Sequence, residues 1–283
     1  MNIGIIQGRL SPPIEGFQEC PVDWKREFTL LPVAGLTHIE WIITHNSFYN
    51  NPFFDNDLTR YDISSVCADN LVDSRITETQ FLKDNLIPIC DAALKNNVKN
   101  VTIPLLEDSD LTDDKKRDIF CNEIAEIGKI YSSLNFSFEI ENIAHVISDI
   151  IYLRDNFYLT YDTGNMTTVG VDHTRYLKMF YGKINNVHLK DRDINNNTVP
   201  PGTGNTNFNS IFSFLKYRNY DLNYTLQTAR EDGDEFETIL RHKKTLEKIY
   251  EQSIWLNRQD SPDYRGSRFT WPKACRGNFR TKR

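Results

Sequence analysis

The sequence predicts a (β/α)8 barrel, in which eight parallel strands form a ring and each strand is followed by a helix. Short apolar segments with strand character alternate with longer segments eight times over residues 1–252. In addition, polar residues end four successive strands, and these residues can converge only if the strands lie side by side in one parallel sheet. The length of 283 residues suits a single domain of this kind.

The expected elements follow one another without a gap long enough for a second domain. Short apolar runs predict strands at 2–7, 37–43, 63–68, 100–103, 136–141, 157–162, 184–189 and 222–227. We expect helices at 24–32, 78–96, 112–133, 143–154, 172–181, 207–217 and 234–252. Pro104 is expected to stop the fourth strand, and Asp113 and Asp114 suit the first turn of the helix that follows it. The loop 44–60 shows no helical period, and the loop 191–206 is rich in Asn, Pro and Gly.

The net charge of −6 is unevenly distributed along the chain. Residues 253–283 hold eight Lys/Arg and two Asp, so residues 1–252 carry a net charge of −12. An acidic body argues against nucleic-acid binding, which needs clustered Lys and Arg. The segment 253–283 has no periodicity, and we expect an extended or disordered tail, or one that wraps a neighbouring molecule.

The five Cys are scattered without C-x-x-C spacing, which favours free thiols in a reducing compartment. The N-terminus MNIGIIQGRL lacks the basic region and the apolar length of a signal peptide. No stretch approaches 18 apolar residues, so we expect no membrane span. These features predict a soluble cytoplasmic protein.

Four expected strands end at residues able to bind a divalent metal or polarise a sugar oxygen. These residues are Glu141 in FEIEN, Asp162 in YDTGN, His188 in NVHLKDR and Gln227 in YTLQTAR. Glu139 shares a strand face with Glu141 but is expected one layer deeper, where an unpaired carboxylate is unfavourable. A single Glu or His at a strand end is more often a solvated or structural residue, but four in register favour a site. Oxygen and nitrogen ligands without thiolate suit Mn²⁺, Mg²⁺ or Co²⁺, and Zn²⁺ is compatible.

The chain resembles the xylose isomerase-like (β/α)8 superfamily, in its sugar phosphate isomerase/epimerase (AP endonuclease 2-like) family. The resemblance covers about residues 1–250 and rests on IGIIQGRL, GLTHIEW, EN, YDTGN, VHLKDR, PPGTGNTNF and LQTAR. It implies a divalent metal on Glu141, Asp162, His188 and Gln227, and a small-molecule carbohydrate substrate. In epimerases of this family the first and last ligands also move a proton at the carbon beside a ketone, while the metal polarises the carbonyl. Homodimers or homotetramers are common in the family, but the sequence has no diagnostic interface.

Gln227 departs from the family pattern, which has a Glu at this position. A carboxamide oxygen can bind a metal, but a carboxamide cannot abstract a proton. Three alternatives follow. Glu141 is the sole acid/base, as in an aldose–ketose isomerase or a dehydratase; a second base such as Glu40, His45 or Lys190 takes over; or the chain binds without catalysis.

Other polar residues near the strand ends are candidate substrate contacts. Lys190, Arg192 and Arg230 surround the last two strands, where such barrels often bind phosphate, although surface salt bridges are an equally good interpretation. Gly202 and Gly204 lack the strand-then-helix context of a dinucleotide site and predict a tight loop. Trp41 and Phe53 or Phe54 suit a wall for a sugar, core packing or dimer packing. The full set of expected substrate contacts is Gln7, Arg9, Glu40, Asn165, Lys190, Arg192 and Arg230.

The leading hypothesis is a metal-dependent isomerase or epimerase of a sugar, sugar phosphate or related polyol. Proton transfer α to a carbonyl would run through Glu141, with His188 and Gln227 completing the catalytic group. One alternative is an inosose-type dehydratase that uses the same site, and another is a non-catalytic sugar-binding protein. A DNA-repair enzyme like endonuclease IV is disfavoured, because six His in all and an acidic body do not suit a three-metal site on DNA.

Overall fold

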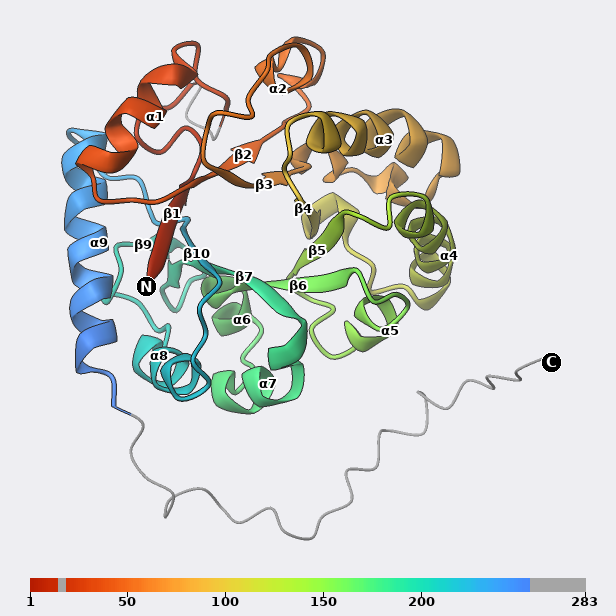
Figure 1. Ribbon diagram of the computed structural model, residues 1–283. Coiled ribbons are helices and arrows are strands. Elements are labelled where there is room, and N and C mark those ends of the chain that lie inside the picture. Colours follow the sequence, from red (N-terminus) through yellow and green to blue (C-terminus); the bar gives the residue numbers. More distant parts are fainter. Residues whose placement is uncertain (15–18, 255–283) are drawn as a thin grey trace, which may run out of the picture.

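The computed structural model describes residues 1–14 and 19–254, and these residues form one closed barrel surrounded by helices (Figure 1). All neighbouring strands are parallel, in the order β1-β10-β7-β6-β5-β4-β3-β2. The predicted (β/α)8 barrel is therefore confirmed, while the expected tail lies almost wholly outside the described residues. The strands are β1 (Asn2–Ile6), β2 (Ile39–Ile42), β3 (Ile63–Cys67), β4 (Asn100–Leu105), β5 (Asn135–Ile140), β6 (Phe157–Asp162), β7 (Ile184–Leu189) and β10 (Asn223–Leu226).

The helices lie on the outside of the barrel, and short helical turns fill several loops (Figure 1). The longer helices are α1 (Trp24–Val33), α3 (Thr79–Lys95), α4 (Asp114–Ile130), α7 (His173–Phe180), α8 (Phe208–Tyr217) and α9 (Glu235–Gln252). The short ones are α2 (Pro52–Asp55), α5 (Ser148–Ile151) and α6 (Thr163–Thr168). Single 3-10 turns occur at Phe48–Asn50, Asp69–Leu71, Ser74–Thr77, Glu107–Ser109 and Tyr181–Lys183, and the loop after β7 forms a hairpin of β8 (Asp191–Arg192) and β9 (Thr198–Val199).

Two expectations about element boundaries are wrong. Pro104 does not stop β4, which continues to Leu105. The carbonyl of Thr102 accepts the amide of Ala68 and therefore faces β3. Pro104 lies two residues further along β4, so its backbone nitrogen faces the same side. Because the pairing of β4 with β3 ends at Thr102, the missing N–H of Pro104 removes no hydrogen bond between the strands. The helix expected at 143–154 is reduced to α5, because the apolar residues that suggested it are buried in turns instead.

The interior of the barrel is polar, which is unusual for a fold normally filled with branched apolar residues. Glu40 on β2 and His188 on β7 come from strands that are not neighbours in the ring, and their side chains meet, so both point inward. Ile6, Ile42 and Cys67 form a small apolar cluster that is separate from the main core. The main core lies between the outer faces of the strands and the helices, with Trp41, Phe138, Tyr161 and Leu226 among its members.

The loop after β7 is built around the buried carboxylate of Asp191. It accepts backbone N–H groups from Gly202 (2.8 Å) and Gly204 (2.9 Å) at Oδ2, and from Thr206 (3.0 Å) at Oδ1. Gly202 has a φ of +85°, which a glycine adopts without strain. The glycines of PPGTGN therefore enclose a carboxylate of their own chain, which agrees with a tight loop rather than a nucleotide site.

Gly204→Ala is expected to destabilise the fold by about 1–3 kcal/mol, because it forces side-chain atoms into occupied space. A Cβ at this position would lie 2.4 Å from Oδ1 of Asp191 and 2.5 Å from the carbonyl oxygen of Arg192. Gly182→Ala is the matched control, since a Cβ there meets nothing within 4 Å. Urea unfolding of the two variants tests this expectation; equal stabilities would show that the loop can move aside.

Candidate active site

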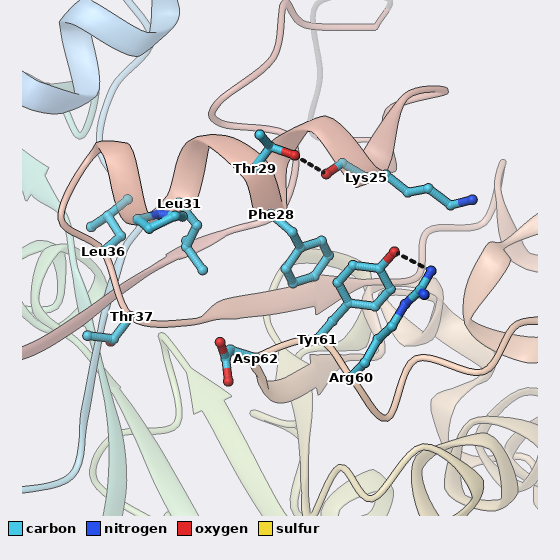
Figure 2. Close-up of a pocket in the computed structure, with 10 residues that line it drawn as sticks. Lys25, Phe28, Thr29, Leu31, Leu36, Thr37, Arg60, Tyr61 and Asp62 are labelled. Carbon is cyan, nitrogen blue, oxygen red and sulfur yellow. Dashed lines mark hydrogen bonds between the residues drawn. The ribbon is translucent and has the colours of Figure 1, made fainter.

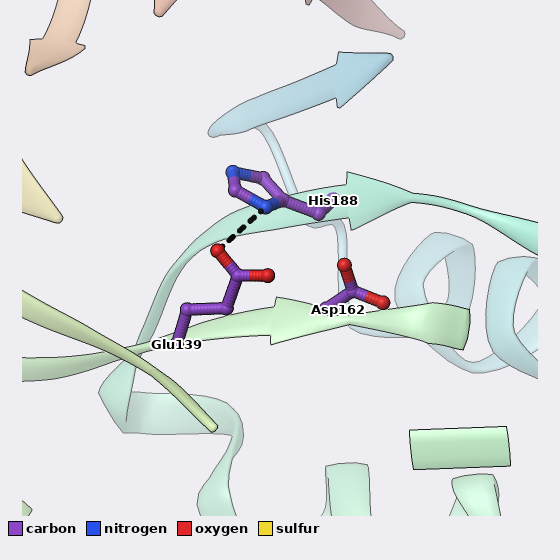
Figure 3. A group of neighbouring side chains, drawn as sticks. All are labelled: Glu139, Asp162 and His188. Carbon is purple, nitrogen blue, oxygen red and sulfur yellow. Dashed lines mark ion pairs between the residues drawn. The ribbon is translucent and has the colours of Figure 1, made fainter. Parts of the chain in front are cut away.

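Three buried side chains from three neighbouring strands meet inside the barrel (Figure 3). Glu139 comes from β5, Asp162 from the end of β6 and His188 from β7. One ligand atom from each residue lies within 4.8 Å of the others, and the residues are 3%, 1% and 0% exposed. Two carboxylates and one imidazole at this spacing form a donor set able to hold a divalent cation.

Glu139, and not Glu141, belongs to this group, whereas the sequence led us to expect Glu141 as the first metal ligand. β5 ends at Ile140, so Glu141 is the first residue of the following loop and is only partly buried. Glu139 lies inside the barrel with its Oε2 3.3 Å from Nδ1 of His188. The expected penalty for a deep carboxylate is offset, because Glu139 is paired with His188.

Glu40 forms a hydrogen bond with the ring nitrogen of His188 that faces away from Glu139. Nε2 of His188 lies 2.9 Å from Oε2 of Glu40, and this oxygen also accepts the side-chain amide of Asn186 at 2.7 Å. Glu40 is 0% exposed, and its contact with His188 supports the imidazole. The expected role of Glu40 as a substrate contact or second base stays a prediction, while its observed contact is with His188. A hydrogen bond from Nε2–H to Glu40 leaves Nδ1 directed toward Glu139, an arrangement typical of histidines that bind metals.

The electrostatics of the group follow from burial and close charges. Burial opposes ionisation of Glu139, but His188 and Lys190 outweigh it and keep the pKa of Glu139 below its usual value. Burial also opposes protonation of His188, yet Glu40 and Glu139 on either side raise its pKa well above the ordinary value. By contrast, burial raises the pKa of Glu141 at the mouth, against the opposing charges of Arg192 and Lys190. The pKa of Glu139 is thus lowered, while the pKa of Glu141 is raised.

The YDTGN motif fixes the carboxylate of Asp162. Its Oδ1 accepts the amide of Asn165 at 2.7 Å and caps α6, a helix too short to be predicted from periodicity. Its Oδ2 lies 2.8 Å from Nζ of Lys190. Thr163, which follows β6, connects this segment to the residues after β7. Its Oγ1 donates to the carbonyl of Lys190 (2.7 Å) and accepts the amide of Lys190 (2.9 Å).

Asn165 and Arg192 extend this network toward the barrel mouth. The amide of Asn165 donates to Oε1 of Glu139 at 3.3 Å, and its oxygen accepts Arg192 at 3.4 Å. Gly164 leaves room for the chains that pass beside it, since a Cβ there would lie 2.8 Å from Cγ of Lys190 and 3.0 Å from Cγ of Arg192. The structure therefore brings Asn165, Lys190 and Arg192 together beside the three-residue group.

Gln227 follows β10, and its backbone amide donates to the carbonyl of Leu189 at 3.2 Å. This contact places it next to the end of β7 and its site residues. Its Oε1 is buried and finds no hydrogen-bond partner among the described residues. Nδ1 of His188 likewise has no aligned hydrogen bond within the described part of the chain. Buried polar atoms without partners are rare, and Oε1 of Gln227 fits a bound divalent cation.

Gln7, Arg9 and Arg230, which the sequence predicts as substrate contacts, form hydrogen bonds with the protein backbone. Gln7 is 0% exposed, and its Oε1 accepts the amide of Ile42 at 3.2 Å. Arg9 donates to the carbonyl of Thr228 at 2.8 Å. Arg230 donates to the carbonyls of Gly8 (2.7 Å) and Ser11 (3.2 Å). Both arginines thus bind the backbone of the loops after β1 and β10 and do not point freely into the site.

Four other candidates make their contacts outside the group of Glu139, Asp162 and His188. His45 has a side chain that is 48% exposed, and it approaches Asp73 at 3.7 Å. Trp41 is fully buried against the helices, and its indole N–H donates to Asn51 at 2.8 Å. Phe53 is buried beside Trp41 with ring centroids 5.7 Å apart, and Phe54 is partly buried against the same core. Core packing, and not a sugar wall, is therefore the role of these aromatic residues.

Asp69, which the sequence did not single out, is a further acidic group at the mouth. It directly follows Ala68 after β3, and burial raises its pKa to about 7, with additional contributions from Glu139, Glu107 and Glu19. The sequence SVCAD shows an acidic residue just after a strand. It does not show that carboxylates from three other loops or strands lie near Asp69, which is why the residue could not be singled out. A carboxyl with such a pKa at a strand end is typical of functional sites.

Asp69→Asn is expected to stabilise the protein increasingly as the pH rises from about 4 to about 7. Because the pKa of Asp69 is raised in the folded state, wild-type Asp69 keeps its proton when folded and loses it when unfolded over this pH range. The free energy of unfolding of the wild type therefore falls as the pH rises. The Asn side chain does not ionise, so the variant is free of this decrease in stability. Melting temperatures measured at several pH values test it, with the exposed Asp108→Asn as control; a pH-independent difference would contradict the expectation.

A cavity of about 370 Å³ lies at the other end of the barrel (Figure 2). Its walls come from α1 and from residues that precede β2 and β3, including Phe28, Thr37 and Asp62. Arg60 donates to the hydroxyl of Tyr61 across one side. This cavity is at the amino-terminal ends of the strands, whereas active sites of such barrels lie at the carboxyl-terminal ends.

A family model described as a xylose isomerase-like TIM barrel matches residues 72–258. The chain belongs to this family. The match includes β4 to β10, and therefore Glu139, Asp162, His188 and Gln227. No curated protein matches the sequence.

Several solved structures share the fold of this xylose isomerase-like chain. The D-psicose 3-epimerase from Clostridium cellulolyticum H10 has a TM-score of 0.66 and 14% identity, over 90% of this chain and 100% of that chain. The IOLI protein, solved with a bound zinc atom, has a TM-score of 0.66 and 16% identity, over 90% and 100%. The "probable 3-DHS dehydratase AsbF" from Bacillus anthracis has a TM-score of 0.66 and 12% identity, over 87% and 99%. At these identities the likeness establishes the fold alone.

The neighbours include sugar epimerases and a protein described as a probable dehydratase, so this fold supports more than one reaction. Among the described residues, no helix has the length and apolar character needed to cross a bilayer.

Proposed function

We propose that the protein is a metal-dependent isomerase or epimerase that moves a proton at the carbon beside a sugar carbonyl. The main support is the buried group of Glu139, Asp162 and His188 at the carboxyl ends of adjacent strands. These residues would hold the cation together with the unpartnered Oε1 of Gln227. A bound divalent cation would supply Lewis-acid polarisation of the substrate carbonyl oxygen.

Glu141 is the residue that we assign to proton transfer. It is partly exposed in the loop after β5, whereas Glu139 lies sealed beneath it and is 3% exposed. Burial raises the pKa of Glu141, while His188 and Lys190 keep Glu139 ionised against the effect of its own burial. Two carboxyl groups with opposite shifts suit different roles, one holding the cation and one exchanging a proton.

The other residues of the site position these two groups. Glu40 orients His188, and the amide of Asn165 donates to Glu139. Lys190 is paired with Asp162 and would therefore act as a cation and not as a base. Because Gln227 cannot accept a proton from carbon, a single acid/base group favours transfer on one face of the substrate, as in an aldose–ketose isomerase.

A lyase reaction of the dehydratase kind is the second candidate. It also needs one base beside a polarised carbonyl, and a structural neighbour described as a dehydratase has the same fold. Loss of water would give a product that is lighter than the substrate by one water molecule, whereas isomerisation leaves the mass unchanged.

The test is a screen of ketoses and aldoses in D₂O with Mn²⁺, Mg²⁺, Co²⁺ or Zn²⁺ added. Incorporation of one deuterium at the carbon beside the carbonyl, detected by mass spectrometry and NMR, is the expected result. Turnover of a sugar without exchange at carbon would contradict the proposed proton transfer.

A further inference from the structure

Gln227 offers a cation only one oxygen, so its orientation matters more than that of a carboxylate. A carboxylate presents two equivalent oxygens, whereas the other arm of a carboxamide is an NH₂ group, which cannot bind a cation. The backbone amide of Gln227 is fixed by its hydrogen bond to the carbonyl of Leu189, the last residue of β7. The contacts of the next residue, Thr228, therefore determine how firmly the other side of Gln227 is held.

Thr228 is 0% exposed, and two residues from outside its loop bind its carbonyl and its hydroxyl. Nη1 of Arg9, in the loop after β1, donates to the carbonyl of Thr228 at 2.8 Å. Oγ1 of Thr228 lies 2.9 Å from Nδ1 of His242 on α9. β1 pairs with β10, and α9 lies on the outside of the barrel at this point (Figure 1). The segment after Gln227 is thus held both by a neighbouring loop and by a helix.

His242 is itself held in one orientation. It is 2% exposed, and its Nε2 lies within hydrogen-bonding distance of Oε1 of Glu231, which also accepts Nη2 of Arg241 at 3.0 Å. The hydrogen bond from Arg241 lowers the pKa of Glu231, so Glu231 is a carboxylate that can only accept. Burial lowers the pKa of His242 and favours the neutral imidazole. Nε2 then carries the proton, and Nδ1 accepts the hydroxyl of Thr228.

The loop that carries Arg9 is fixed as well. Glu27 on α1 accepts the backbone amides of Gly8 at 2.8 Å and Leu10 at 3.1 Å, one on each side of Arg9. Arg230, in the loop after β10, donates to the carbonyl of Gly8 at 2.7 Å. The guanidinium of Arg9 therefore extends from an ordered backbone and can define the position of the carbonyl that it binds.

Resting on the proposed function, we infer that Arg9 and His242 are positioning residues that hold the peptide after Gln227, so that Oε1 of Gln227 is directed at the cation. Neither residue is among the ligands that would hold the cation. Their contacts compensate for the single oxygen of Gln227, because a side chain that projects from a fixed backbone has fewer ways to turn this oxygen aside.

The affinity of the folded full chain for Mn²⁺ tests this inference in two variants. Thr228→Val keeps the shape of the side chain but removes the hydroxyl that binds His242, and Arg9→Met removes the donor to the carbonyl. Each variant is expected to bind Mn²⁺ about tenfold more weakly than wild type, whereas Thr228→Ser keeps the hydroxyl and should keep the affinity. Thr245→Val is the matched control, because its hydroxyl donates to the carbonyl of Arg241 within α9.

The same titrations in a Gln227→Ala background separate positioning from a general loss of structure. This background retains Glu139, Asp162 and His188, so it is expected to bind Mn²⁺ measurably. If Thr228→Val acts through Gln227, it should cause no further loss of affinity once Oε1 is absent. An equal loss in both backgrounds, or a loss in neither, would overturn the inference and leave the proposed metal centre intact. Absence of Mn²⁺ binding by wild type would overturn the proposed function, and the inference with it.

Discussion

Replacing Glu141 by Gln is expected to abolish deuterium incorporation into the substrate while leaving the metal bound. The substitution keeps the size of the side chain but removes the group that exchanges a proton, so the rate should fall by about 10²–10⁴-fold. The cation is expected to remain, because Glu139, Asp162 and His188 form the buried group without Glu141. The measurement combines the exchange rate on a sugar found in the ketose screen with the metal content of the same sample.

Two control variants make this result specific. Glu126→Gln alters a carboxyl whose side chain is 73% exposed on α4, and it should change neither quantity. Glu139→Gln should lose metal and exchange together. If Glu141→Gln keeps both its metal and its exchange rate, Glu141 is not the acid/base, and the proton must pass through another group.

Replacing Glu40 by Gln is expected to weaken metal binding by about 10–100-fold, although Glu40 would not touch the metal. Glu40 accepts the hydrogen bond from Nε2 of His188 and thereby directs Nδ1 toward Glu139. A Gln at this position can present its NH₂ group instead and reverse the imidazole. The loss should also destabilise the metal-free protein by about 3–5 kcal/mol, because His188 and Glu40 are both 0% exposed and would lose a buried charge pair.

Metal titration and urea unfolding of Glu40→Gln, with Glu126→Gln as control, separate a positioning role from a purely structural one. A structural role alone would reduce stability without changing the affinity of the folded protein for Mn²⁺. Unchanged metal affinity in folded Glu40→Gln would therefore contradict the assignment of Glu40 as a positioning residue for His188.

The sequence predicts the barrel well because strand-forming runs and helical periodicity are local signals. β6 and β7 end where the pattern places them, so Asp162 and His188 are found at the strand ends. The helix α6 was missed because it is six residues long and depends on the cap from Asp162. In the segment 143–154 the sequence predicts a longer helix than the structure has. The apolar residues there are buried, but only Ser148–Ile151 form a helix.

The depth of a side chain inside the barrel cannot be read from the sequence. Alternation places Glu139 and Glu141 on one face, but only the stagger of the strands decides which of them reaches His188. The same holds for Glu40, which is expected to face the site and whose observed contact is with His188. The contacts of Arg9 and Arg230 with backbone carbonyls depend on loop geometry, so their side chains resembled substrate contacts in the sequence.

The most direct test of the central claim is the divalent metal content of freshly purified wild type, Glu139→Gln, Glu141→Gln and His188→Ala. The structure predicts about one ion per chain in wild type and Glu141→Gln, and loss of the ion in Glu139→Gln and His188→Ala. No binding by wild type after addition of Mn²⁺, Mg²⁺, Co²⁺ or Zn²⁺ would contradict a metal centre at Glu139, Asp162 and His188. Loss of the ion in Glu141→Gln but not in Glu139→Gln would contradict the assignment of its ligands.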